Sequence, residues 1–164
     1  MSPELEIFRR NPSSKPKSKT PIVFVHGAFT GAWCWNEHFL TWFADQGFET
    51  ISFSLRGHGG SGGRDLRSLA SIDDYVEDLE TVVDTLGQKP ILIGHSMGGY
   101  IIQKYLEKHK VTAAVLMASV PPEGLLASNT MMAMAKPDLY LQMFWLQAIG
   151  PHTLLRDRLG RAML

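Results

Sequence analysis

The segment that decides the fold runs from residue 90 to residue 99 and reads Pro90-Ile91-Leu92-Ile93-Gly94-His95-Ser96-Met97-Gly98-Gly99. Its first four residues form a short apolar run, which predicts a buried strand over 90–93. A helix is expected from Met97 to about residue 109. The pattern G-x-S-x-G occupies residues 94–98, so Ser96 falls at the sharp turn from strand to helix.

This turn is of the kind that exposes a nucleophilic serine. A chain that reverses from strand to helix in so few residues forces the serine into a strained backbone conformation. Side chains at Gly94 and Gly98 would then collide, so glycine fits both positions. The following helix directs its N-terminus at the serine hydroxyl, and the Met97 N–H can stabilise an oxyanion there. The pattern predicts Ser96 as a nucleophile, and the alternative is a glycine-rich turn with an incidental serine.

Further elements extend outward from this turn. Apolar runs predict strands over residues 22–25, 48–55 and 113–119, with a short edge strand over 5–8. Helices are predicted over 36–46, capped by Asn36, and over 72–86, where Ser71 and Asp74 have the spacing of a capping box. Strands that alternate with helices predict an α/β fold, with a parallel sheet and helices on both of its faces.

A second motif, from His26 to Phe29, follows the first core strand. Loops at the carboxyl ends of neighbouring parallel strands meet at the ligand crevice, so the Ala28 N–H is expected to face the same oxyanion as Met97. Gly27 allows the main chain to come close. His26 is predicted to be a structural histidine that holds this loop by hydrogen bonds.

A third motif introduces a competing function class. Residues 57–62 match G-x-G-x-x-G after a strand, as in dinucleotide-binding proteins. The acidic residues about twenty positions on, Glu77 and Asp78, fall inside a predicted helix instead of at a strand end. A tight loop is the preferred interpretation, and nucleotide binding is the weaker alternative.

Together these three motifs resemble the α/β-hydrolase superfamily in order and spacing, from about Ile22 to Ser119. The likeness is greatest to bacterial serine hydrolases of the lysophospholipase, esterase and small-lipase type. It implies a Ser–His–Asp triad, a carboxylic ester or lipid substrate, no cofactor and no metal. It also implies residues 1–120 as the N-terminal part of the hydrolase core and residues 121–164 as the start of a helical lid.

The lid segment is rich in apolar side chains that suit an acyl or ester pocket, or that only pack the lid on the core: Leu125, Met131, Met132, Met134, Phe144 and Trp145. Candidates for the remaining triad positions are weak. His109 is expected to be solvated at a polar helix end, His152 lies within the lid, and Glu123 is expected in a turn. The sequence therefore predicts a hydrolase truncated after the start of its lid. A naturally short, catalytically inactive ligand-binding relative is the alternative.

Composition sets the remaining expectations. Lys and Arg together number 16, as do Asp and Glu, so the zero net charge argues against a nucleic-acid partner. One cysteine, Cys34, cannot form a disulfide within the chain, and no apolar stretch is long enough to span a membrane. A cytoplasmic protein is expected. The sheet edge beside the strand at 113–119 is expected to be uncovered, which favours self-association.

Overall fold

The computed structural model describes residues 3–13, 15–63 and 70–149. The chain divides into two compact units, Met1–Pro122 and Glu123–Leu164. The first unit holds the sheet and the Ser96 turn. Among its described residues, 123–149, the second unit holds two helices, α5 (Leu126–Ala135) and α6 (Pro137–Ile149).

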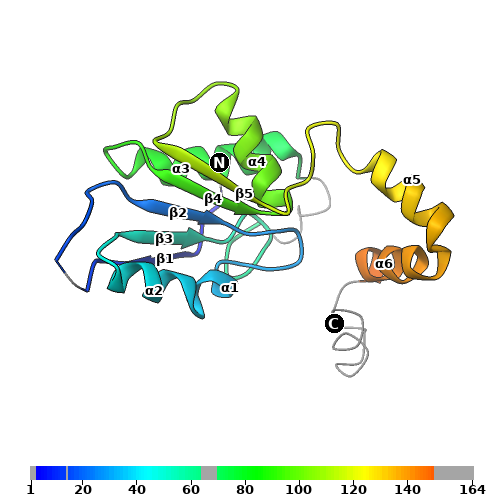
Figure 1. Ribbon diagram of the computed structural model, residues 1–164, viewed down its shortest axis with the longest axis horizontal. Coiled ribbons are helices and arrows are strands. Elements are labelled where there is room, and N and C mark those ends of the chain that lie inside the picture. Colours follow the sequence, from blue (N-terminus) through cyan, green and yellow to red (C-terminus); the bar gives the residue numbers. More distant parts are fainter. Residues whose placement is uncertain (1–2, 14, 64–69, 150–164) are drawn as a thin grey trace. The chain divides into compact units, whose positions relative to one another are not determined.

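The first unit is built on a five-stranded sheet in the order β1-β3-β2-β4-β5 (Figure 1). The strands are β1 (Ile7–Arg10), β2 (Ile22–Val25), β3 (Thr50–Phe53), β4 (Ile91–His95) and β5 (Ala113–Met117). The last four are parallel to one another, as predicted, but β1 pairs antiparallel with β3, with Ile7 opposite Phe53. The sheet is therefore mixed at this edge, where the sequence predicted a short strand without its direction. A parallel crossover normally needs a helix, and the described residues between β1 and β2, 11–13 and 15–21, contain none.

Strand β2 lies at the centre of the core and is buried along its whole length. Because successive side chains point to opposite faces of a sheet, its four residues divide between two apolar clusters. Val23 and Val25 pack with side chains of the helices over 72–84 and 97–106. Ile22 and Phe24 pack with Trp35 and its neighbours. Burial on both faces explains why β2 is a continuous apolar run.

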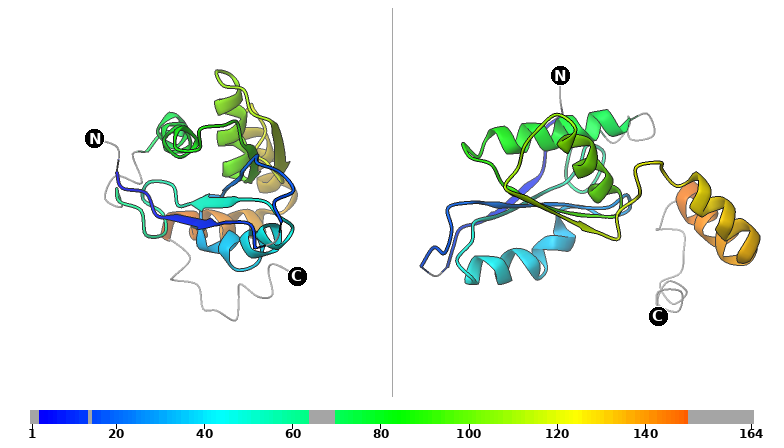
Figure 2. Two further views of the ribbon diagram at one scale, coloured as in Figure 1. Left: turned by 90° about the vertical axis from the view of Figure 1, so that its left-hand side faces the viewer. Right: turned by 45° about the horizontal axis from the view of Figure 1, so that its top comes forward.

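The helices cover both faces of the sheet (Figures 1 and 2). Helices α1 (Trp33–Asn36) and α2 (Phe39–Asp45) lie on one face, and α3 (Ile72–Asp84) and α4 (Met97–Leu106) lie on the other. The capping box on α3 is confirmed, since Ser71 N–H donates to Asp74 Oδ2 (2.8 Å) and Asp74 N–H donates to Ser71 Oγ (3.2 Å).

The single helix predicted over 36–46 is wrong, because the chain forms two short helices there. Asn36 ends α1 instead of capping α2, and its Oδ1 accepts a hydrogen bond from Arg10 Nη2 (3.1 Å). The residue before α2 is His38, which makes no side-chain capping bond. Trp35 is buried against Phe24, so packing on the sheet determines where these helices lie.

Strand β5 forms the outer edge of the sheet within the described part of the chain. All five of its residues are exposed, including Val115, Leu116 and Met117. Self-association through this edge stays a prediction. No helix among the described residues has the length and apolar character needed to cross a membrane.

Candidate functional site

Ser96 lies between the last residue of β4, His95, and the first residue of α4, Met97. Its backbone has φ 53° and ψ −117°, far from the values that L residues normally adopt. Such a conformation persists only where the surrounding structure holds it, and it is most common at functional sites. Ser96 therefore has the backbone expected of the predicted strand–helix turn.

Hydrogen bonds on both sides of Ser96 hold this conformation. Its N–H donates to Met117 O at the end of β5 (2.9 Å). Its carbonyl oxygen accepts from the N–H groups of Gly99 (3.0 Å), Tyr100 (3.3 Å) and Val120 (3.2 Å). The turn is thus fixed by α4 on one side and by the segment around β5 on the other.

The two glycines of the motif are required by close backbone contacts. A Cβ atom at Gly94 would lie 2.6 Å from the carbonyl carbon and oxygen of Gly98. A Cβ atom at Gly98 would overlap Val25 O and lie 2.6 Å from His26 O. The collision between positions 94 and 98 was predicted from the sequence. The structure adds that the start of α4 packs directly on the end of β2, where larger residues have no room.

The loop after β2 comes close to Ser96. A Cβ atom added at Gly27 would lie 3.3 Å from Ser96 Cβ. The predicted oxyanion donors, the N–H groups of Ala28 and Met97, therefore belong to two segments that meet at Ser96. The Met97 N–H is among the first amides of α4, which have no acceptor inside their own helix.

His26 holds the Gly27–Ala28 segment, as predicted. The ring is fully buried, and its Nε2 accepts a hydrogen bond from Leu55 N–H (3.0 Å). Its Nδ1 therefore carries the proton and donates to Gly27 O (2.7 Å). Within one trans peptide, the carbonyl and the N–H point in opposite directions. By fixing the Gly27 carbonyl, His26 also sets the direction of the Ala28 N–H.

The burial of His26 predicts a pH-dependent stability. Its pKa is lowered from 6.5 to about 4, chiefly because burial disfavours the charged ring. Between these pH values the unfolded chain takes up a proton that the folded chain does not, so stability falls as the pH falls. We expect a loss of about 3 kcal/mol between pH 7 and pH 4 from this group.

Urea unfolding at several pH values measures this effect. His26→Gln is expected to reduce the slope of stability against pH in that window, and His38→Gln at an exposed site is the matched control. Equal slopes for wild type and His26→Gln would show that the pH dependence of stability does not come from His26.

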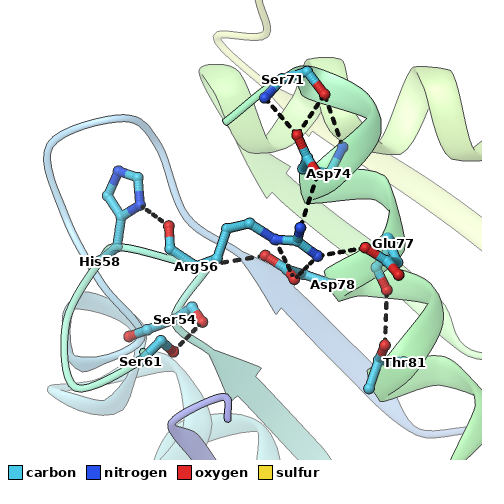
Figure 3. Close-up of polar contacts among 9 residues, drawn as sticks. All are labelled: Ser54, Arg56, His58, Ser61, Ser71, Asp74, Glu77, Asp78 and Thr81. Atoms are coloured by element: carbon cyan, nitrogen blue, oxygen red, sulfur yellow. Dashed lines mark hydrogen bonds and ion pairs between the residues drawn. The ribbon is translucent and has the colours of Figure 1, made fainter. Parts of the chain in front are cut away.

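The glycine-rich loop after β3 is tied to α3 by Arg56 (Figure 3). The backbone N–H and the side-chain Nε of Arg56 both donate to the buried carboxylate of Asp78 (2.8 and 2.9 Å). Its guanidinium also pairs with Asp74 (2.9 Å) and Glu77 (2.7 Å). Burial raises the pKa of Asp78, and the hydrogen bonds from Arg56 offset part of that rise.

These contacts argue against the nucleotide-binding alternative. The two acidic residues at the required distance, Glu77 and Asp78, are both engaged by Arg56. The Gly60 N–H donates to the carboxylate of Glu6 (3.0 Å), so an anionic side chain of the protein already occupies one of the loop amides. The loop is better explained as a structural connection between β1, β3 and α3.

The candidates for the triad base and acid do not join Ser96 in the described part of the chain. His109 pairs with Glu80 (2.8 Å) and stacks on Tyr105, beyond the far end of α4 from Ser96. It is therefore partnered, where the sequence predicted a solvated side chain. His152 lies outside the described residues. Glu123 belongs to the second unit, and no position relative to Ser96 is assigned to it.

One contact at the site was not predicted from the sequence. His58, inside the glycine-rich loop, lies with its Nε2 2.8 Å from Ala28 O. A histidine among glycines at the carboxyl end of a core strand was the available signal, because such strand ends meet at the crevice.

The chain is similar to one protein family and to several known enzymes. The model of the Alpha/beta hydrolase family matches residues 22–163. Methyl jasmonate esterase 1 of Vitis vinifera is 36% identical over 110 residues, which cover 65% of this chain and 41% of that protein. A non-heme haloperoxidase of Rhodococcus erythropolis is 34% identical over 113 residues, covering 64% of this chain and 39% of that protein.

A search of solved structures finds the same fold. The monoacylglycerol lipase of Paleococcus ferrophilus superposes with a TM-score of 0.61 at 23% identity, covering 82% of this chain and 52% of the lipase. The chain spans about 40% of the length of the methyl jasmonate esterase and of the haloperoxidase. Because the family match extends over most of the chain, this protein belongs to the alpha/beta hydrolase family.

Proposed function

We propose that Ser96 is the nucleophile of a serine hydrolase that acts on carboxylic esters or lipids. The observation that carries the proposal is the backbone of Ser96, at φ 53° between a buried strand and a helix, with the Gly27–Ala28 loop beside it. On this proposal the turn makes the hydroxyl accessible to an ester, and the N–H groups of Ala28 and Met97 lie beside it, as acyl transfer requires.

The reaction would proceed in two steps. Ser96 Oγ adds to the ester carbonyl carbon while a general base takes its proton, and the new oxyanion accepts hydrogen bonds from the Ala28 and Met97 N–H groups. Collapse breaks the ester C–O bond and releases the alcohol, which receives that proton. Water, deprotonated by the same base, then attacks the acyl-serine, restores Ser96 and releases the carboxylic acid.

The names of the relatives support an ester substrate. They include a methyl jasmonate esterase, a methylesterase and, at the level of fold, a monoacylglycerol lipase. The second unit exposes large apolar side chains that suit an acyl chain, among them Met131, Met134 and Phe144. We propose that this unit belongs to the start of a helical lid.

A non-catalytic ligand-binding protein is the second candidate. It is favoured by one observation: among residues 3–13, 15–63 and 70–149, no imidazole is hydrogen-bonded to Ser96 Oγ. A serine without a positioned base is a weak nucleophile. On this alternative the same crevice would bind an ester without cleaving it.

Product analysis separates the two candidates. The protein as encoded by its gene is incubated with methyl and aryl carboxylic esters, and the acid formed is quantified by mass spectrometry, with calorimetric titration of the same esters in parallel. Catalytic release of acid supports the hydrolase. Saturable binding without acid release supports the second candidate. Because some relatives are named haloperoxidases, bromide with hydrogen peroxide serves as a parallel assay.

A further inference from the structure

His58 occupies a buried position between the glycine-rich loop and the loop that carries Ala28. Its side chain is 7% exposed, and each of its ring nitrogens faces a backbone carbonyl oxygen. Nε2 lies 2.8 Å from Ala28 O, and Nδ1 lies 3.1 Å from Arg56 O. A carbonyl oxygen can only accept, so the ring is the donor in its contact with Ala28 O, from Nε2.

The loop that presents His58 is held in place independently of His58 (Figure 3). Arg56 anchors its start to α3, and Ser61 Oγ donates to Ser54 O near its end (2.5 Å). The residues on either side of His58, Gly57 and Gly59, have φ values of 75° and 49°, which a side chain would strain. The glycine-rich pattern thus forms a loop that is hydrogen-bonded near both ends and carries a single histidine between two glycines.

Ala28 lies between two peptide groups, and each is fixed by a different histidine. The Gly27–Ala28 peptide contains the Ala28 N–H and is held at Gly27 O by His26 (2.7 Å). The Ala28–Phe29 peptide is held at Ala28 O by His58 (2.8 Å). Rotation of Ala28 would turn its N–H away from the oxyanion, and the bond from His58 opposes that rotation.

We propose that His58 is a positioning residue of the oxyanion hole. It touches no substrate atom and acts through Ala28, whose N–H it keeps directed at the charge that develops beside Ser96. The proposal rests on the proposed function, in which Ala28 is an oxyanion donor. It also gives the motif at residues 57–62 a role in place of nucleotide binding.

A purely structural role for His58 makes a different prediction. The ring also packs near the rings of His26 (5.2 Å between centroids) and Tyr75 (5.9 Å). If packing alone mattered, any substitution would act through stability, and the identity of the donor would not matter. Substitutions that place an amide at one ring nitrogen or the other separate the two roles.

The test compares three variants of the protein as encoded by its gene. His58→Gln carries an N–H near the position of Nε2 and retains a donor for Ala28 O. His58→Asn carries one near the position of Nδ1 and reaches only Arg56 O. His58→Phe fills the space with no donor. Each is assayed for kcat and KM on p-nitrophenyl acetate, and for its melting temperature, beside wild type and Ser96→Ala.

We expect His58→Asn and His58→Phe to lower kcat by about 10- to 100-fold with little change in KM, because a donor to the transition state is misplaced. His58→Gln is expected to stay within about threefold of wild type. If His58→Phe does not fold, the Gln and Asn pair carries the comparison.

Two kinds of result overturn the proposal: one concerns only the role of His58, and the other concerns the proposed function itself. If Ser96→Ala abolishes turnover but Gln and Asn at position 58 behave alike, only the role of His58 is wrong. If Ser96→Ala retains wild-type turnover, or wild type itself cleaves no ester, the proposed function fails and the role of His58 fails with it.

Discussion

Replacing Ser96 with alanine is expected to lower kcat for ester hydrolysis by about 10⁴-fold or more, because the covalent route is lost and only oxyanion binding remains. Substrate binding should change little, since the hydroxyl contributes mainly in the transition state. Steady-state hydrolysis of p-nitrophenyl acetate, with the protein as encoded by its gene, measures both quantities.

The matched control is Ser119→Ala. Ser119 is a half-buried serine close to the same turn, and its Oγ accepts a hydrogen bond from Gln103 Nε2 (2.7 Å). It has no place in the proposed reaction, so this variant should keep turnover near wild type. Equal losses in the two variants would show that the turn is merely sensitive to substitution and that Ser96 is not the nucleophile.

The largest expected effect on stability comes from Gly98→Ala. The new Cβ would overlap Val25 O and lie 2.6 Å from His26 O, both on backbone that cannot give way without moving β2. We expect a loss of more than about 3 kcal/mol in the free energy of unfolding, at the upper end for an overpacked site. Urea unfolding monitored by circular dichroism measures it.

Gly87→Ala is the matched control for adding a Cβ atom. Gly87 follows α3 with φ 64°, and a Cβ there would meet nothing within 4 Å. Only the backbone penalty applies, so the expected cost is about 1–2 kcal/mol. If Gly98→Ala costs no more than Gly87→Ala, the close packing of α4 on β2 is not what requires glycine at the turn.

Local chemistry in the sequence was enough to predict the central part of the fold. The run from Ile22 to Val25 is apolar on both faces because both faces are covered, and Ser71 with Asp74 form a box that needs no distant partner. The turn at Ser96 was predictable because a Cβ at Gly94 would meet Gly98 within the turn itself, whereas the contact of Gly98 with the end of β2 is not visible in the sequence.

Other features depend on contacts between segments far apart in the chain. Strand β1 pairs with β3, whose residues lie at least 40 positions away in the chain, with Arg10 opposite Thr50. The break between α1 and α2 reflects the burial of Trp35 and the bond from Arg10 to Asn36. Arg56 lies 22 residues from Asp78, so their ion pair leaves no local pattern in the sequence.

The candidate site divides in the same way. Ser96, Ala28 and Met97 were predicted from motifs, and the structure brings their segments together. The contact from His58 to Ala28 spans 30 residues between two loops, and no spacing rule connects them. The roles of these groups in catalysis stay proposals until they are measured.

Covalent trapping tests the central claim most directly. The native protein is treated with a fluorophosphonate, digested and mapped by tandem mass spectrometry, with a heat-denatured sample and the Ser96→Ala variant beside it. A single phosphonyl adduct on Ser96, absent from both controls, is the predicted result. An adduct on another residue, or none on Ser96 of the native protein, would contradict the assignment of Ser96 as nucleophile.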